Sequence, residues 1–197
     1  MIFTFILPAF VAVFALLCSA KQLEERQTSG NSFNLYAYGE GINGLQVFYA
    51  DGQAQIGDMS LSNASNKVPM YVTYSNNKPS TWVAHVNNTQ SSQLAFAATG
   101  TTSSTTNLLC LKKGNTVTNP VAFTGMDAIT SLSSDSGTIT DVWSLYGAYV
   151  LLSQPNGNFY AKSTGQNGWW QLMWSTSQRA ALEATPLALK TNPPVLS

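Results

Sequence analysis

The sequence predicts an all-β protein, a single-domain antiparallel β-sandwich or barrel built from hairpin meanders. Three observations predict this fold class. Short runs alternate apolar and polar side chains, turns rich in glycine and asparagine separate these runs, and the apolar period of an amphipathic helix is almost absent. Many short strands with such turns are typical of sandwiches and barrels.

The nucleus of the sheet is expected at Leu35–Asp58, where apolar runs flank a glycine-rich break and a tight turn. The turn is Asp51–Gly52, and this residue pair supplies the positive φ angles that a two-residue hairpin needs. On the return strand 53–57, Ala54 and Ile56 face one side and the two glutamines face the other. The segment therefore predicts three strands with one covered face.

The middle of the chain continues this pattern of half-buried strands and polar loops. On one of these strands Trp82, Ala84 and Val86 are expected to face inward, with Thr81 on the other side. Strands are expected at 68–74, 80–86, 93–98, 108–111 and 121–123, and loops at 58–67, 99–107 and 125–137.

The last third predicts a meander. The segment 139–143 leads into 145–153, which is apolar on both faces and is therefore expected as a central strand. Asn156–Gly157 indicates a hairpin turn, and 165–168 indicates a second turn before the strand 169–175. A short helix is expected at 177–184, and a closing strand at 187–189.

The N-terminus predicts export. Residues 2–17 are almost wholly apolar and end in Cys18-Ser19-Ala20, which fits a signal peptide of residues 1–20. The alternative is a retained membrane anchor, but the run is short for one. Residues 21–30 form a polar leader or pro-segment, or simply a frayed terminus, and the single β domain is assigned to 31–197.

Composition excludes some partners. Nine acidic and nine basic residues balance, and charged residues make up only 9% of the chain. Nucleic acid and anionic membrane surfaces both need a clustered positive field, so neither is an expected partner. No membrane contact is expected after signal cleavage, and the oligomeric state is left open.

Cysteine and glycosylation motifs agree with a secreted chain. After signal cleavage Cys110 is the one cysteine left, so no intramolecular disulfide can form. It lies in an apolar strand and is expected to be a buried, inert thiol. Asn63 and Asn87 lie in N-x-S/T sequons within polar loops, and both are expected to carry N-glycans.

Groups that could carry catalysis are few. His85 is the only histidine, and it has no acid or nucleophile at a spacing typical of a triad, so a partly exposed strand histidine is expected. Asp141 is the one carboxylate expected to be partly buried. No catalytic residue, metal ligand set or cofactor is assigned. The acids considered as a glycosidase pair are Glu40, Asp51, Asp58, Asp127, Asp135, Asp141 and Glu183.

Aromatic residues give the candidate binding site. On the strand 169–175, Trp170 and its alternate neighbours are expected in the core, while Trp169 and Gln171 share the opposite face. Tyr160 lies on the neighbouring hairpin strand. A ring beside an amide suits sugar stacking plus a hydrogen bond. The alternative is that this face is covered as well.

Three stretches carry a resemblance: LYAYG…GLQVFYADGQAQIGD, GNFYAKS…NGWWQLMW and PLALKTNPP. Together the chain resembles a group of small secreted proteins of filamentous ascomycete fungi that has no assigned activity. The resemblance implies extracellular or cell-wall localisation, and it transfers no catalytic residue.

The expected function is therefore a secreted, non-catalytic extracellular or cell-wall protein that binds glycan or acts as a host-directed effector, with polysaccharide or a host protein as partner. The alternative is a β-sandwich glycoside hydrolase whose motif is not recognised. A pair of carboxyl groups about 5–10 Å apart in a cleft would favour the hydrolase.

Overall fold

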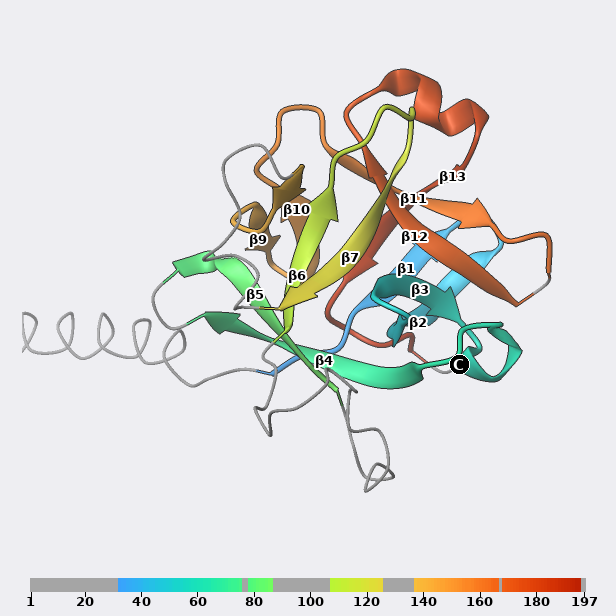
Figure 1. The fold of residues 1–197 in the computed structure, drawn as a ribbon, viewed down its shortest axis with the longest axis horizontal. Helices are drawn as coiled ribbons and strands as arrows, with labels where there is room; N and C mark the ends of the chain where they lie inside the picture. The colour runs from blue at the N-terminus through green and yellow to red at the C-terminus, as the bar shows by residue number, and fades with distance from the viewer. Residues whose placement is uncertain (1–31, 76–77, 87–106, 126–136, 167, 196–197) are drawn as a thin grey trace, which may run out of the picture. The chain divides into compact units, whose positions relative to one another are not determined.

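The computed structural model describes residues 32–75, 78–86, 107–125, 137–166 and 168–195, and in these ranges every strand pairing is antiparallel (Figure 1). The predicted all-β antiparallel class is confirmed. The elements are β1 (Tyr36–Gly39), β2 (Ile42–Ala50), β3 (Gln53–Gly57), η1 (Met59–Leu61), β4 (Lys67–Ser75), β5 (Lys78–Val86), β6 (Asn107–Lys112), β7 (Asn119–Gly125), β8 (Thr138–Ile139), β9 (Trp143–Tyr146), β10 (Tyr149–Leu152), β11 (Asn158–Ser163), β12 (Trp169–Ser175), η2 (Gln178–Leu182) and β13 (Thr185–Lys190).

The β2–β3 hairpin forms where the sequence predicts it. Asp51 has φ 45° and Gly52 has φ 84°, as the tight turn requires, and Val47 lies opposite Ile56. The prediction of one covered face is wrong on β3, because Gln55 is only 8% exposed. The hydroxyl of Ser62 donates to its side-chain oxygen at 2.7 Å, so this glutamine is buried with its polar group satisfied.

Two closed rings of strand pairings share this hairpin. One ring runs β1–β2–β3–β12–β11–β13 and closes where β13 pairs with β1. The other runs β2–β4–β5–β6–β7–β3 and closes through the contact of Gln53 with Ala122. The segment that the sequence singles out is therefore common to both rings.

An aromatic stack runs through the core. Trp82 stacks on Trp143 with ring centroids 5.3 Å apart, and Trp143 stacks on Phe159 at 6.1 Å. The inward face predicted for Trp82 and Ala84 is confirmed, although Thr81 on the other face is also buried. The side chain of Val86 lies outside the described part of the structure.

The prediction of one central strand over 145–153 is wrong. β9 and β10 form a hairpin there, with Tyr149 opposite Tyr146 and the turn at Gly147 in a positive φ of 59°. β9 is the last strand in the pairing order, and Leu151 is 47% exposed. Aromatic and apolar side chains on both faces do not by themselves require burial on both faces.

The turn at Asn156 is present, with φ 58°, but the predicted hairpin around it is wrong. β10 and β11 do not pair with each other, because β13 lies between them. The turn at 165–168 does join a hairpin, in which Ser163 lies opposite Trp170. Local turn chemistry predicts the turn, whereas the strand inserted from the end of the chain decides the pairing.

The remaining elements agree with expectation in type. The predicted helix at 177–184 is the short 3-10 helix η2, capped by the Ser177 hydroxyl. The expected strand 93–98, the loop 99–106, most of the loop 125–137 and the sequon residue Asn87 lie outside the described residues. Within the described residues, no helix has the length and apolar character needed to cross a membrane.

Candidate functional site

The predicted trio shares one face of the sheet. Tyr160 lies opposite Met173 on the β11–β12 hairpin, and Trp169 and Gln171 alternate with it on β12, so all three side chains point to the same side. The rings are nevertheless covered, with Trp169 only 8% and Tyr160 only 5% exposed.

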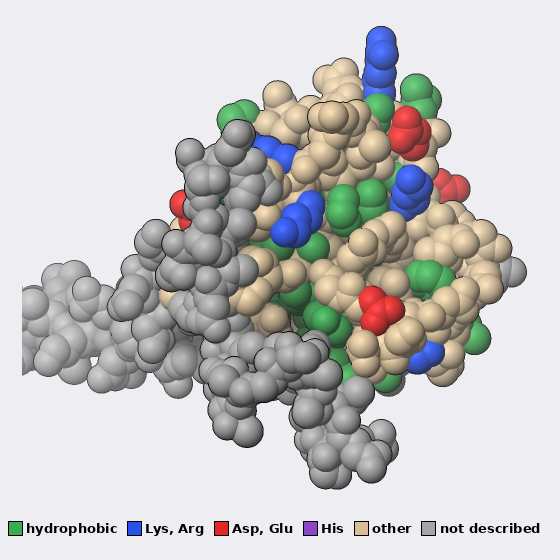
Figure 2. All heavy atoms as spheres, in the orientation of Figure 1, with side chains coloured by type: hydrophobic (Ala, Val, Ile, Leu, Met, Phe, Trp, Pro, Cys, Tyr) green, Lys and Arg blue, Asp and Glu red, His purple; other side chains and the backbone are tan. Residues whose placement is uncertain are grey.

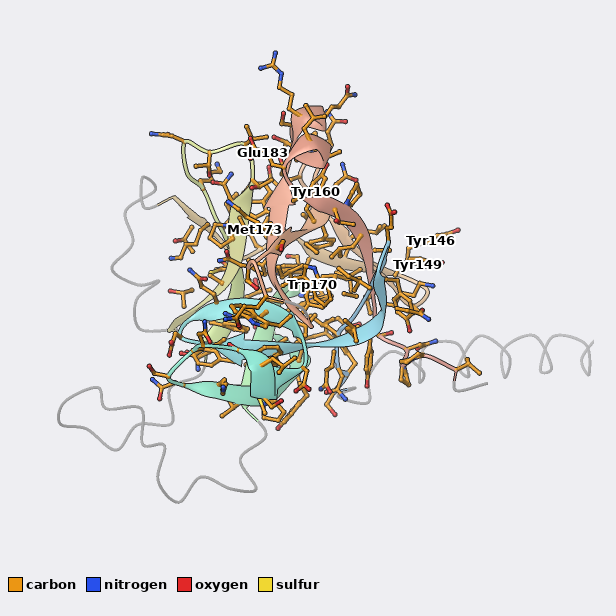
Figure 3. All side chains as sticks on the ribbon, turned by 90° about the vertical axis from the view of Figure 1, so that its right-hand side faces the viewer. Tyr146, Tyr149, Tyr160, Trp170, Met173 and Glu183 are labelled. Carbon is orange, nitrogen blue, oxygen red and sulfur yellow. The ribbon has the colours of Figure 1, made fainter. Side chains whose placement is uncertain are left out.

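Side chains of the same molecule cover this face. Tyr160 and Met173 pack with Ala180 and Ala184 at η2, and Figure 3 shows these two labelled side chains close together. The indole of Trp169 donates to the Gln166 side chain at 3.2 Å, and the amide of Gln171 donates to Gln53. The rings of Trp169 and Tyr160 are therefore packed within the protein, which is the alternative that the sequence left open, whereas Gln171 is half-buried.

A second group of aromatics lies in register across neighbouring strands. Tyr146 lies opposite Tyr149, Tyr149 lies opposite Lys190, and Lys190 lies opposite Tyr36. Residues directly opposite one another in antiparallel strands share a face. Tyr38 lies two residues after Tyr36 on β1. We call the group of Tyr36, Tyr38, Tyr146, Tyr149 and Lys190 the tyrosine row.

The outer part of the tyrosine row is open to solvent. Tyr146 is 76% exposed and Tyr149 is 46% exposed, whereas Tyr36, Tyr38 and Lys190 are half-buried. Figure 3 shows Tyr146 and Tyr149 beside one another at the margin of the ribbon, away from Trp170 and Tyr160. Exposed aromatic side chains gathered on one strip are more informative than the same residues scattered singly.

Lys190 links the row through its charge. Its ammonium nitrogen lies 4.7 Å from the ring centroid of Tyr38 and 4.6 Å from that of Tyr149. Both separations are within the range of a cation–π interaction. The lysine thus holds two tyrosines that come from strands on opposite sides of β13.

Backbone contacts fix the same residues. The N–H of Thr191 donates to the carbonyl of Ala148 at 2.9 Å and ties the β9–β10 turn to the end of β13. The Tyr38 hydroxyl donates to the carbonyl of Asn192 at 3.0 Å. A side chain at Gly44 would collide with Pro194, so the segment after β13 lies tightly against β2. Tyr38, Tyr149 and Lys190 of the tyrosine row are therefore held in place rather than free, which preorganises this part of the surface.

Sequence reasoning missed this group because it treated Tyr146 and Tyr149 as the interior of a central strand. The usable signal was Gly147 between two tyrosines, because a glycine at that spacing marks a turn. The pairing of Lys190 with Tyr36 joins the two ends of the described chain, and no local pattern predicts it.

The carboxylates that the structure describes give no support to a catalytic pair. All five that the structure describes are exposed, and the predicted partial burial of Asp141 is wrong because it lies in the bend before β9. Hydrogen bonds from Asn66 and Ser65 lower the pKa of Asp51, and hydrogen bonds from Ser60 lower that of Asp58. A glycosidase acid needs the opposite shift.

Other candidate groups have structural partners. His85 is partly exposed, as predicted, with its Nε2 atom 2.9 Å from the Thr73 hydroxyl and its ring stacked on Tyr71. Cys110 is buried, as predicted, and burial raises the pKa of its thiol to about 11. Among the residues that the structure describes, no group of three or more acidic, histidine or cysteine side chains could hold a metal ion.

Comparison with family models, with curated proteins and with solved structures gave no match.

Proposed function

We propose that this protein is a secreted, non-catalytic extracellular protein that binds polysaccharide through the tyrosine row. The observation that carries the proposal is the register of Tyr146, Tyr149, Lys190 and Tyr36 across four strands. A strip of aromatic rings on a rigid sheet offers π-faces on which the C–H faces of sugar rings stack. The tyrosine hydroxyls and the lysine can orient the bound polysaccharide by hydrogen bonds.

The composition supports a carbohydrate partner, because charged residues make up only 9% of the chain. On the face drawn in Figure 2, charged side chains are scattered among hydrophobic side chains and uncharged groups. Such a surface offers mostly hydrogen bonds and stacking, and sugars supply both of these interactions. On β2, the half-buried Gln46 continues the row beyond Tyr36 and adds an amide.

A binding role is better supported than hydrolysis. The two described carboxylates with shifted pKa values, Asp51 and Asp58, are both held in the charged form. Asp51 accepts hydrogen bonds that tie the β2–β3 turn to the loop before β4, and Asp58 accepts one that caps η1. Neither belongs to the tyrosine row. Neither of these two described carboxylates therefore has the raised pKa that a glycosidase acid beside the aromatic surface would need.

Affinity electrophoresis tests the proposal. Native protein is run through gels that contain polygalacturonate, methyl-esterified pectin, soluble β-glucan or arabinoxylan. We expect retardation of the wild type in at least one gel, and loss of retardation in a Tyr146→Ala, Tyr149→Ala double variant, because stacking faces are removed. The variant should keep the wild-type circular dichroism spectrum, since both side chains are exposed.

A matched control distinguishes the row from general surface stickiness. Leu182 on η2 is 86% exposed and lies outside the row, so Leu182→Ala should migrate as the wild type does. Wild-type protein that is retarded in none of the four gels would overturn the proposal in favour of a host-protein partner.

A further inference from the structure

We infer that the tyrosine row selects an acidic sugar, with Lys190 binding the carboxylate of a uronic acid residue. This inference rests on the proposed function, since it specifies the ligand of that same surface.

The ammonium group of Lys190 is confined between two aromatic rings. Lys190 is half-buried at the centre of the row, and its nitrogen lies 4.6 Å and 4.7 Å from the two ring centroids of Tyr149 and Tyr38. The rings restrict where the charge can lie and remove part of its hydration. A lysine is usually a mobile surface charge, so this confinement sets Lys190 apart.

The ammonium group of Lys190 has no anionic partner among the described residues. Within them it contacts the two rings alone, and no carboxylate lies within ion-pair distance of it. An ammonium group carries three N–H donors, which leaves donors available on the side that the rings do not cover. A partly desolvated cation without an anion is a natural binding point for an anionic ligand.

The charge of Lys190 lies beside the exposed rings of the tyrosine row. Tyr146 and Tyr149 continue the row outward from Lys190, so a sugar ring stacked on them lies next to the ammonium group. A pyranose that carries a carboxylate satisfies both the stacking surface and the charge. A neutral sugar satisfies only the first.

The test compares polygalacturonate with methyl-esterified pectin, which shares its backbone but lacks the charge. We expect retardation by the acidic polymer to exceed that by the ester, and added salt to weaken it. Lys190→Met removes the charge and keeps the aliphatic stem. It should lower affinity for polygalacturonate by about tenfold or more, the usual value of one charge-assisted hydrogen bond.

Two further variants make the result specific. Lys113 is exposed directly after β6, so Lys113→Met removes the same charge elsewhere and should leave retardation unchanged. Lys190→Arg keeps a cation and should keep the preference for the acidic polymer. If Lys190→Met lowers the thermal midpoint, the inference is decided on the wild type alone. Its retardation by polygalacturonate is then compared with that by methyl-esterified pectin, with and without added salt.

The outcomes separate the inference from the proposed function. Three outcomes would overturn the inference and leave polysaccharide binding in place. The acidic polymer and its methyl ester could retard the protein equally, a folded Lys190→Met variant could bind as the wild type does, or β-glucan or arabinoxylan alone could retard the wild type. No retardation in any gel would remove both.

Discussion

Trp82 stacks on Trp143 in the core at a centroid separation of 5.3 Å and an interplanar angle of 24°, yet the two indoles differ in hydrogen bonding. The Trp143 indole donates to the carbonyl of Leu109 at 2.9 Å. The Trp82 indole N–H is buried and has no acceptor in the described structure. An unsatisfied buried donor costs free energy that a satisfied one does not.

Replacing each tryptophan with phenylalanine should therefore give unequal losses of stability. Both changes remove similar volume from fully buried sites, but only Trp143→Phe breaks a buried hydrogen bond. We expect Trp143→Phe to lower the free energy of unfolding by about 1–3 kcal/mol more than Trp82→Phe. Urea denaturation measures both values, and equal losses would show that the hydrogen bond to Leu109 is not the deciding difference.

Cys110 should resist thiol reagents in the native protein. Burial raises the pKa of its thiol from 9.0 to about 11, and the Lys112 charge only partly opposes this, so little thiolate exists near neutral pH. We expect no labelling until denaturant is added. Because the folded pKa is the higher one, the thiol stabilises the fold fully below pH 9.0, and this contribution is lost as the pH rises towards 11.

The control for the expected pH dependence of stability is Cys110→Ala. The difference in unfolding free energy between wild type and this variant should be constant up to pH 9.0 and shrink above it. A difference that stays constant up to pH 11 would contradict the raised pKa.

Asp51 should make stability sensitive to acid. Its carboxylate accepts the backbone N–H groups of Ser65 and Asn66, each at 2.8 Å, and these bonds lower its pKa below 3.8. A lowered folded pKa means that the stabilisation is present above pH 3.8 and is lost as the pH falls through the folded value. Asp51→Asn keeps a residue that tolerates the positive φ and removes the charge.

Thermal midpoints of wild type and Asp51→Asn measure this effect. We expect the wild type to be the more stable protein at neutral pH and the two midpoints to converge below pH 3.8. If the two thermal midpoints stay equally far apart at neutral pH and below pH 3.8, the difference comes from side-chain geometry rather than from the carboxylate charge.

Asn63 should carry a glycan when the protein is made in a eukaryotic secretory host. Its side chain is exposed in the loop after η1, and the backbone of Ser65 in the same sequon is tied to Asp51. Asn63→Gln and Ser65→Ala should each abolish the glycan at Asn63 and so increase gel mobility by the shift of one glycan. Asn87→Gln should give a second increase of the same kind. Mobility that N-glycanase leaves unchanged would contradict both sites.

Local sequence predicted the parts of the fold that local chemistry controls. The Asp51–Gly52 turn, the alternation on β4 and β5 and the burial of Cys110 all follow from side chains within one hairpin or strand. The error over 145–153 has a physical source, because tyrosine suits both a buried strand and an exposed edge. The Gly147 turn and the end position of β9 decide between these states.

The candidate site was less predictable than the fold. Trp169 and Tyr160 do share a face, which the period of the strand predicts, but their exposure depends on η2 packing over that face. Conversely, Lys190 meets Tyr36 and Tyr149 only because β13 inserts between β1 and β10. Long-range strand order, which turn chemistry does not encode, therefore decides which aromatics are free.

The closure of the first ring by β1 and β13 has a consequence for biosynthesis. A ribosome makes β1 before all the other strands and β13 after them, so the edge of β1 that pairs with β13 stays unpaired while the strands between them are made. Tyr36 and Lys190 come together only when that edge is closed. An unfinished or misassembled chain therefore has no complete tyrosine row, and the polysaccharide binding that we propose would distinguish finished molecules from unfinished ones.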